Sequence, residues 1–159
     1  MALSLRAAIA ADLPLIAALI RELAEYERLA DEVRFDEAGL GEQLFGARPY
    51  AEVVIGELDG VAQGFALFFH NFSTFEGKPG IYLEDLFVRS EARGNGLGKA
   101  LLAQLAALAV ERNCARLEWA VLDWNAPAIG FYRGLGARAM DEWTTMRVDG
   151  PALAALAAA

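Results

Sequence analysis

The segment Arg93-Gly94-Asn95-Gly96-Leu97-Gly98 constrains this chain most, because it joins a run typical of a buried strand to a run with helical periodicity. The strand-like run covers Ile81 to Val88, and the helical run covers Lys99 to Val110. A connection with so few Cβ atoms lets a ligand approach the backbone, and the helix that follows offers unpaired N–H groups and the positive end of its dipole. The segment therefore predicts an anion-binding loop suited to a pyrophosphate.

Three kinds of glycine loop compete for this segment, and the spacing of the residues separates them. A Walker A loop needs Ser or Thr after its Gly-Lys pair, whereas Gly98-Lys99 is followed by Ala100. A dinucleotide-binding loop needs Gly-x-Gly-x-x-Gly, whereas these glycines fall at every second position. The remaining pattern, Arg-x-x-Gly-x-Gly between a strand and a helix, resembles the coenzyme A loop of the GNAT superfamily of acetyltransferases. A glycine-rich connector without a ligand stays open as the alternative.

Length and charge limit the class of protein. The chain has 159 residues, enough for one domain over residues 1–159 with a single buried core. Its net charge of −8 argues against nucleic acid or an anionic membrane as a partner and suits a cationic substrate. Charged residues interrupt every apolar run before it reaches the ~18 residues of a membrane span. The N-terminus lacks the pattern of a secretion signal, so we expect a cytoplasmic protein.

The lone cysteine and the lone histidine predict packing rather than chemistry. Cys114 lies in an apolar, strand-like run, where a thiol usually acts as a small buried hydrophobe. His70 follows an apolar run and has no second His or Cys at metal-ligand spacing, so we expect a polar residue at a strand end and no metal.

Periodicity and turn signals predict alternating strands and helices. Leu3 to Ala8 is expected to form a strand, and Asp12 and Pro14 are expected to cap and open a helix that reaches about Leu29. Asp59-Gly60 between two β-rich runs predicts a hairpin. The other expected elements are a short or broken helix at Phe35–Phe45, strands at Ala51–Leu58, Val61–Phe69, Ile81–Val88, Ala115–Val121 and near Ala137–Val148, a loop at Asn71–Gly80, a helix from about Pro127, and a helix-prone tail at Pro151–Ala159.

Two further segments make the resemblance more specific. Tyr82-Leu83-Glu84-Asp85 leads into the glycine loop, and Asp123-Trp124-Asn125-Ala126-Pro127 leads into a segment that ends in Phe131-Tyr132. Together with Leu19 to Glu27, they resemble the diamine (spermidine/spermine) and thialysine N-ε-acetyltransferases within GNAT. This resemblance implies an α+β GNAT fold, with a mostly antiparallel twisted sheet, one splayed strand pair and flanking helices.

The resemblance implies acetyl-CoA as the acetyl donor and no metal. Main-chain N–H groups of the glycine loop would hold the pyrophosphate, and the end of the preceding strand would pair with the pantetheine arm like an added strand. Arg93 is expected to add a charge-assisted bond to phosphate. The cofactor-binding residues implied are Leu86, Phe87, Val88, Arg93, Gly94, Asn95, Gly96, Leu97, Gly98, Lys99, Asn125 and Ala128.

Tyr132 and Glu84 match the family's general acid and base. A thiolate leaving from a thioester needs a proton from a neutral donor, and a phenol stays protonated at neutral pH. An alkyl amine with a pKa of about 10 must lose a proton before its nitrogen attacks, and Glu84 on a half-buried strand could take it. Alternation along a strand predicts that Asp85 points to the opposite face of the sheet. Packing of Tyr132 and a salt bridge of Glu84 are the structural alternatives.

The acceptor site is implied by four further residues. Tyr26 and Glu27 match positions that line the amine pocket of the family, where they would act with Glu84. Spermidine/spermine enzymes have an acidic residue and a Trp at the positions of Ser73 and Phe75, whereas thialysine-type sequences share the Ser. We therefore expect a small amino-acid-like amine rather than a long polyamine.

The resulting prediction is an acetyltransferase that moves acetyl from acetyl-CoA to a primary amine by direct attack in a ternary complex. The alternatives are a non-catalytic acyl-CoA binding module of the same fold and a phosphate-loop nucleotide binder. Relatives of this type form homodimers, so we expect one here.

Overall fold

The computed structural model describes all 159 residues, which form two compact units, Met1–Ala120 and Val121–Ala159. The first unit contains a five-stranded sheet in the order β1-β2-β3-β4-β5. Neighbouring strands from β1 to β4 are antiparallel, and β5 is parallel to β4. This confirms the predicted α+β class with a mostly antiparallel sheet. The strands are β1 Leu3–Ala7, β2 Glu52–Leu58, β3 Val61–Ser73, β4 Lys78–Val88 and β5 Leu117–Trp119.

Two hairpins build the centre of the sheet. Asp59 and Gly60 have φ values of 51° and 77°, as a two-residue turn of this type requires, so the predicted hairpin is confirmed. The second hairpin is tighter than expected. β3 and β4 stay paired out to Ser73 and Lys78, so the predicted loop at Asn71–Gly80 is wrong at both ends.

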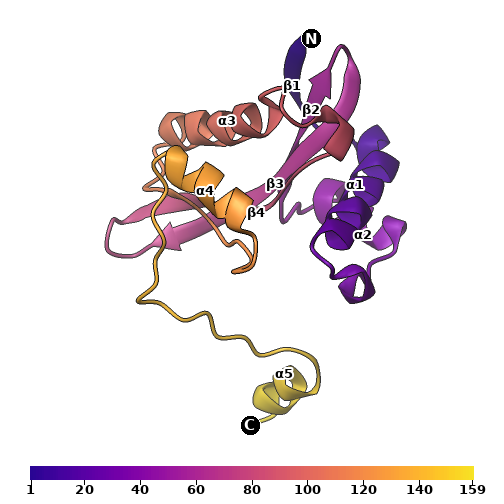
Figure 1. Cartoon of the computed structure of the whole chain (residues 1–159). Helices are drawn as coiled ribbons and strands as arrows, with labels where there is room; N and C mark the ends of the chain where they lie inside the picture. The colour runs from indigo at the N-terminus through magenta and orange to yellow at the C-terminus, as the bar shows by residue number, and fades with distance from the viewer. The chain divides into compact units, whose positions relative to one another are not determined.

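Helices cover both faces of the sheet in the first unit (Figure 1). Helices α1, Leu13–Tyr26, and α2, Glu37–Phe45, pack on one face, where Leu19, Ile55, Phe65 and Phe87 belong to one buried cluster. Helix α3, Leu97–Glu111, packs on the other face through Leu97, Leu101, Leu102, Leu105 and Ala109. Short 3-10 turns occupy Ala10–Asp12, Ala30–Glu32 and Ser90–Ala92.

The ends of α1 differ from the prediction. Asp12 occupies the N-cap position but makes no capping bond, because its carboxylate accepts from the Ile9 N–H and pairs with Arg6. The helix ends at Tyr26 rather than near Leu29, because Arg28 adopts a φ of 62°. The Leu29 N–H then donates to the Ala24 carbonyl at 2.8 Å, which is the Schellman end that a glycine normally makes.

Helix α2 is continuous over nine residues, so of the two expected forms, short or broken, the structure has the short one. The N–H of Gly39 donates to the Asp36 carboxylate at 2.6 Å and caps the helix. A side chain at Gly39 would place its Cβ 3.0 Å from that same oxygen. Gly39 therefore allows the capping residue to approach instead of interrupting the helix.

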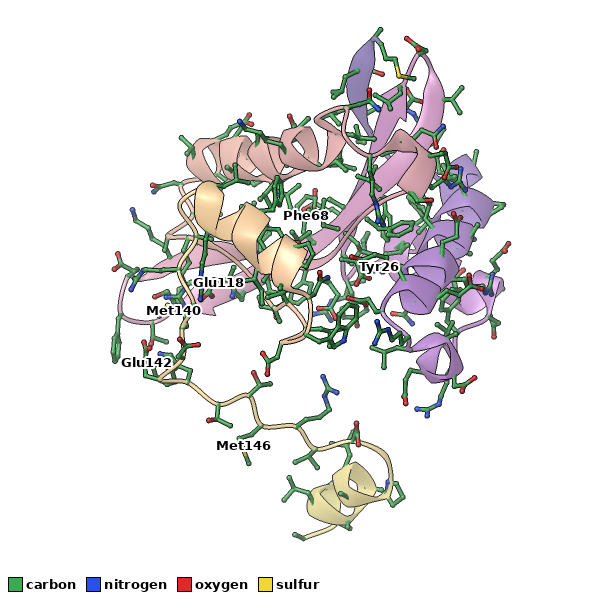
Figure 2. The ribbon with its side chains drawn as sticks, viewed as in Figure 1. Tyr26, Phe68, Glu118, Met140, Glu142 and Met146 are labelled. Carbon is green, nitrogen blue, oxygen red and sulfur yellow. The ribbon has the colours of Figure 1, made fainter.

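The second unit contains α4, Ala126–Gly134, and α5, Gly150–Ala157. The predicted helices from about Pro127 and in the alanine-rich tail are confirmed. The predicted strand near Ala137–Val148 is wrong: this segment joins no ladder, and without a partner an extended chain is not a strand. Met140, Glu142 and Met146 lie exposed along it (Figure 2). No helix in the structure is both long enough and apolar enough to span a membrane.

Candidate functional site

The glycine loop has an open backbone at the start of α3. Gly94 and Gly96 have φ values of 82° and 81°, and a Cβ built on either would meet nothing within 4 Å. Gly96 is the N-cap of α3, and no side chain caps the first-turn N–H groups. The side chain of Asn95 instead holds the loop, because its Nδ2 donates to the Ala92 carbonyl at 3.0 Å. These observations fit an anion held by main-chain amides.

The edge of β4 next to this loop is open. β5 pairs only with Ile81, Tyr82 and Leu83 of β4, so Glu84 to Val88 has no neighbouring strand on that side. An unpaired strand edge offers N–H and C=O groups to an extended ligand. The structure thus places the residues expected to bind the pantetheine arm on a free edge that runs toward the glycine loop.

Arg93 lies close to the end of α1. Its Nε donates to the Val88 carbonyl at 3.0 Å, and its guanidinium lies 4.7 Å from the centroid of the Tyr26 ring and 5.8 Å from that of Phe87. Tyr26, at the end of α1, is 39% exposed (Figure 2). In this arrangement the contacts of Arg93 join the loop to α1.

A bulge in β4 decides where Glu84 and Asp85 point. Asp85 pairs with Leu67 and Leu83 pairs with Phe68, so Glu84 is an extra residue without a partner on β3. Leu67 belongs to the cluster under α1, which places Asp85 on that face, and Glu84 lies on the face opposite to Leu83. Both carboxylates therefore lie on the α1 face, and the prediction that Asp85 points away from Glu84 is wrong.

Three acidic side chains interact in this region. Burial raises the pKa of Glu27, and the charge of Glu84 raises it further. Burial also raises the pKa of Asp85 to about 7, with additional contributions from Glu84 and Glu27. Within Met1–Ala120 none of the three makes a hydrogen bond or an ion pair, and no three His, Cys, Asp or Glu side chains are arranged to bind a metal ion. Such a group can neutralise an organic cation.

Exposure separates the two neighbouring carboxylates. Glu84 was predicted to lie on a half-buried strand but is exposed, whereas Asp85 is partly buried. The sequence contains no signal for this difference, because the bulge depends on the register with β3. Asp85 is thus a candidate functional residue that sequence reasoning missed.

Ser73 and Phe75 lie far from these acids within one chain. Ser73 pairs with Lys78, six positions before Glu84 on β4, a separation of about 20 Å along a strand. The Ser73 side chain is buried and accepts from the Glu76 N–H at 3.2 Å, and Phe75 is fully exposed. A single chain therefore does not bring them together with Glu84.

The remaining expected site residues lie in the second unit. Asn125 is 7% exposed and caps α4, because its side-chain oxygen accepts from the Ala128 N–H at 3.4 Å. Tyr132 is partly buried on α4, with its ring centroid 5.5 Å from that of Phe131. Tyr132 thus lies on a short helix whose N-terminus is capped by the side chain of Asn125.

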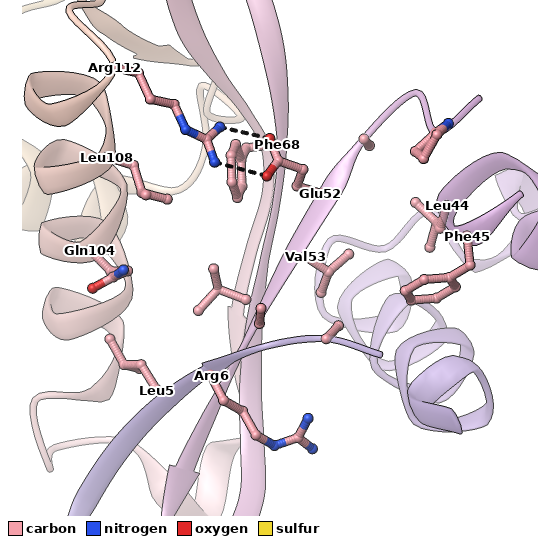
Figure 3. Close-up of a pocket in the computed structure, with 15 residues that line it drawn as sticks. Leu5, Arg6, Leu44, Phe45, Glu52, Val53, Phe68, Gln104, Leu108 and Arg112 are labelled. Carbon is pink, nitrogen blue, oxygen red and sulfur yellow. Dashed lines mark hydrogen bonds and ion pairs between the residues drawn. The ribbon is translucent and has the colours of Figure 1, made fainter. Parts of the chain in front are cut away.

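A pocket elsewhere in the first unit contains none of these residues. It is lined by residues of the end of β1, α2, the start of β2 and α3 (Figure 3). Arg112 donates to both oxygens of Glu52 there, at 2.8 and 3.0 Å, and this pairing lowers the pKa of Glu52.

Cys114 precedes β5 instead of lying in it, and its Sγ is 3.9 Å from His70 Nδ1. His70 lies within β3 rather than at its end.

Comparison with known proteins agrees with this geometry. A family model described as the acetyltransferase (GNAT) family matches residues 16–137. A thialysine N-ε-acetyltransferase of Bos taurus is 39% identical over 150 residues, covering 87% of this chain and 88% of that protein. An L-ornithine N5-acetyltransferase of Arabidopsis thaliana is 33% identical, covering 96% of this chain and 86% of that protein.

A solved structure also matches the whole chain. An integron cassette protein from the mobile metagenome of V. cholerae aligns with a TM-score of 0.83 and 28% identity, covering 100% of this chain and 99% of that one. The glycine loop, the free edge of β4 and these relatives lead to one conclusion. The chain belongs to the GNAT acetyltransferase family and is an acetyl-CoA-dependent N-acetyltransferase.

Proposed function

We propose that this enzyme transfers the acetyl group of acetyl-CoA to a primary amine of a small, amino-acid-like molecule, such as thialysine, lysine or a short diamine, in the cytoplasm. The observation that carries the proposal is the trio of Glu27, Glu84 and Asp85, three acidic side chains that act on one another beside the free edge of β4. The substrates named for the relatives, thialysine and ornithine, support an amino-acid acceptor.

The cosubstrate fits the residues present. The positive φ values of Gly94 and Gly96 and the empty space beside them leave the loop backbone accessible to a pyrophosphate. The backbone of Leu86, Phe87 and Val88 would pair with the pantetheine amides, and Asn125 and Ala128 would border the same ligand. When bound, acetyl-CoA supplies a thioester that an amine can attack.

The chemistry needs a proton acceptor and a proton donor. We propose that the acidic group removes the ammonium proton and that the neutral amine attacks the thioester directly. Tyr132 then protonates the leaving thiolate. The family match over residues 16–137 spans both compact units and supports one catalytic domain built from them. Ser73 and Phe75, if they contact the acceptor, do so from the partner of the expected homodimer.

The experiment is a thiol-release assay on the full chain with acetyl-CoA and a panel of amines. The panel contains thialysine, lysine, ornithine, short diamines, spermidine and aminoalkyl phosphonates. We expect the amino-acid-like amines to give the highest kcat/KM and initial-rate plots to intersect, as a ternary complex requires. A preference for spermidine would contradict the proposed acceptor class, and parallel plots would contradict direct attack.

Two more measurements complete this test. Calorimetric binding of acetyl-CoA without thiol release for any amine would favour the non-catalytic alternative. Light scattering coupled to gel filtration measures the expected homodimer, and a monomeric mass would contradict it.

A further inference from the structure

We propose that Asp85 is the final acceptor of the substrate's ammonium proton, while the exposed Glu84 attracts and orients the cation. This inference rests on the proposed function and reverses the roles that the motif alone suggests. Its basis is the β4 bulge, which places two consecutive carboxylates on one face, one exposed and one recessed.

The surroundings of Asp85 keep it free to take a proton. Two charged groups raise the pKa of Asp85, Glu84 on β4 and Glu27 just after α1, and both are negative. Its partner on β3 is the apolar Leu67. The nearby Arg93 has its guanidinium directed over the Tyr26 and Phe87 rings.

Arg28 follows Glu27 and is the second cation near this end of α1, where its φ of 62° turns the chain away from the helix. With burial and two like charges around it, the Asp85 carboxyl has a pKa of about 7.

This value suits the proton transfer. An alkyl ammonium has a pKa near 10, so transfer to an ordinary carboxylate of pKa about 4 is unfavourable by roughly a millionfold. Transfer to a group at about 7 is unfavourable by only roughly a thousandfold. At neutral pH, the Asp85 carboxyl is also ionised in about half of the molecules, as a proton acceptor must be.

The ammonium loses one proton to the Asp85 carboxylate, and the neutral nitrogen attacks the thioester carbon of acetyl-CoA. The C–N bond forms, the C–S bond breaks, and the thiolate takes a proton from Tyr132, which regains one from the nitrogen. Asp85 then releases its proton to solvent, so that each turnover yields amide, free thiol and one proton.

The test compares Asp85→Asn with Glu84→Gln on two acceptors. One is the best primary alkyl amine of the panel, and the other is its aminooxy analogue, whose nitrogen is already neutral at pH 7. We expect Asp85→Asn to lower kcat/KM about 100-fold for the alkyl amine but less than about threefold for the aminooxy analogue. Equal losses on both acceptors would overturn the proposal.

The pH profile separates the two carboxylates. In the wild type, kcat/KM should decrease as the pH falls below an apparent pKa near 7. Asp85→Asn should abolish this acid limb of the pH profile. Glu84→Gln should keep the limb and mainly raise the KM of the amine. The reverse assignment, with the limb lost only in Glu84→Gln, would overturn the proposal. Glu111→Gln, an exposed carboxylate at the end of α3, is the matched control and should resemble the wild type.

A measurement without substrates tests the same group. Carbon-13 labelling of aspartate side chains lets NMR follow each carboxyl in the free protein, with Asp85→Asn identifying its signal. A midpoint near pH 7 supports the proposal, and a midpoint near pH 4 overturns it. A wild type without thiol release for any amine would instead refute the proposed function, whatever this midpoint is.

Discussion

The guanidinium of Arg93 lies 4.7 Å from the centre of the Tyr26 ring, so one side chain joins the glycine loop to the end of α1. The same side chain donates to the Val88 carbonyl at the end of β4. The loop proposed to bind the cosubstrate and the helix end proposed to bind the acceptor are therefore physically linked.

Arg93→Lys tests this link, because lysine keeps the charge but loses the planar stacking and the Nε bond. An exposed cation–π contact and one hydrogen bond are together worth about 1–2 kcal/mol. We expect the KM values of acetyl-CoA and of the amine to rise together, about five- to thirtyfold, in two-substrate kinetics. A rise for acetyl-CoA alone that shrinks with added salt would indicate a direct phosphate contact instead.

Gly96→Ala should damage cosubstrate binding more than folding. The added Cβ enters open space but must adopt a φ of 81°, which costs about 1 kcal/mol. It also occupies the approach to the loop amides, so we expect at least about tenfold weaker binding of acetyl-CoA by calorimetry. Gly60→Ala, at a φ of 77° in the first hairpin, is the matched control. It should lose a similar amount of stability and leave the affinity for acetyl-CoA unchanged. Equal affinity in both variants would argue against the loop as the binding site.

Tyr132→Phe removes only the phenolic proton donor. We expect kcat to fall about 100-fold or more while the Kd of acetyl-CoA changes less than about threefold. Burst and steady-state measurements of thiol release check this. An unchanged kcat would leave Tyr132 as a packing residue beside Phe131.

Asp12→Asn should reveal a pH-dependent contribution to folding. Arg6 donates to both Asp12 oxygens and lowers the pKa of that carboxyl. Because the folded pKa lies below the unfolded value of about 3.9, the stabilisation is present above that pH and is lost as pH falls through the folded pKa. Arg6 is 38% exposed, so we expect only about 1 kcal/mol between wild type and variant in urea unfolding at pH 7, shrinking toward pH 3. A constant difference over this range would contradict the ion pair.

Asp85→Asn should stabilise the fold at alkaline pH, whereas Asp12→Asn should destabilise it. The folded pKa of Asp85 is about 7, above the unfolded value of about 3.9. Stability from its protonated form is full below the unfolded value and is lost as pH rises through the folded one. The neutral amide avoids this loss, so the variant should exceed the wild type by about 1–4 kcal/mol at pH 8.5 and match it near pH 4. A less stable variant at pH 8.5 would show that Asp85 is not held in an unfavourable charged state.

Features that depend on neighbours in sequence were predictable. Asp59-Gly60 makes the expected turn, because a two-residue hairpin needs left-handed backbone at both positions. The glycine loop opens α3, and the alanine-rich tail forms α5, because both depend on local backbone preferences. Resemblance to the acetyltransferases, which is carried by short contiguous motifs, indicated the family.

Features that depend on contacts distant in sequence were not predictable. Asp12 contacts Arg6 instead of capping its helix, and the segment near Ala137–Val148 has no strand to pair with. The faces of Glu84 and Asp85 follow from one extra residue in β4 relative to β3, which no rule of alternation contains. Local sequence thus determined the family, most of the elements and the glycine loop at the start of α3. Register between strands decided which carboxylate is recessed, because pairing is a property of two strands and not of one.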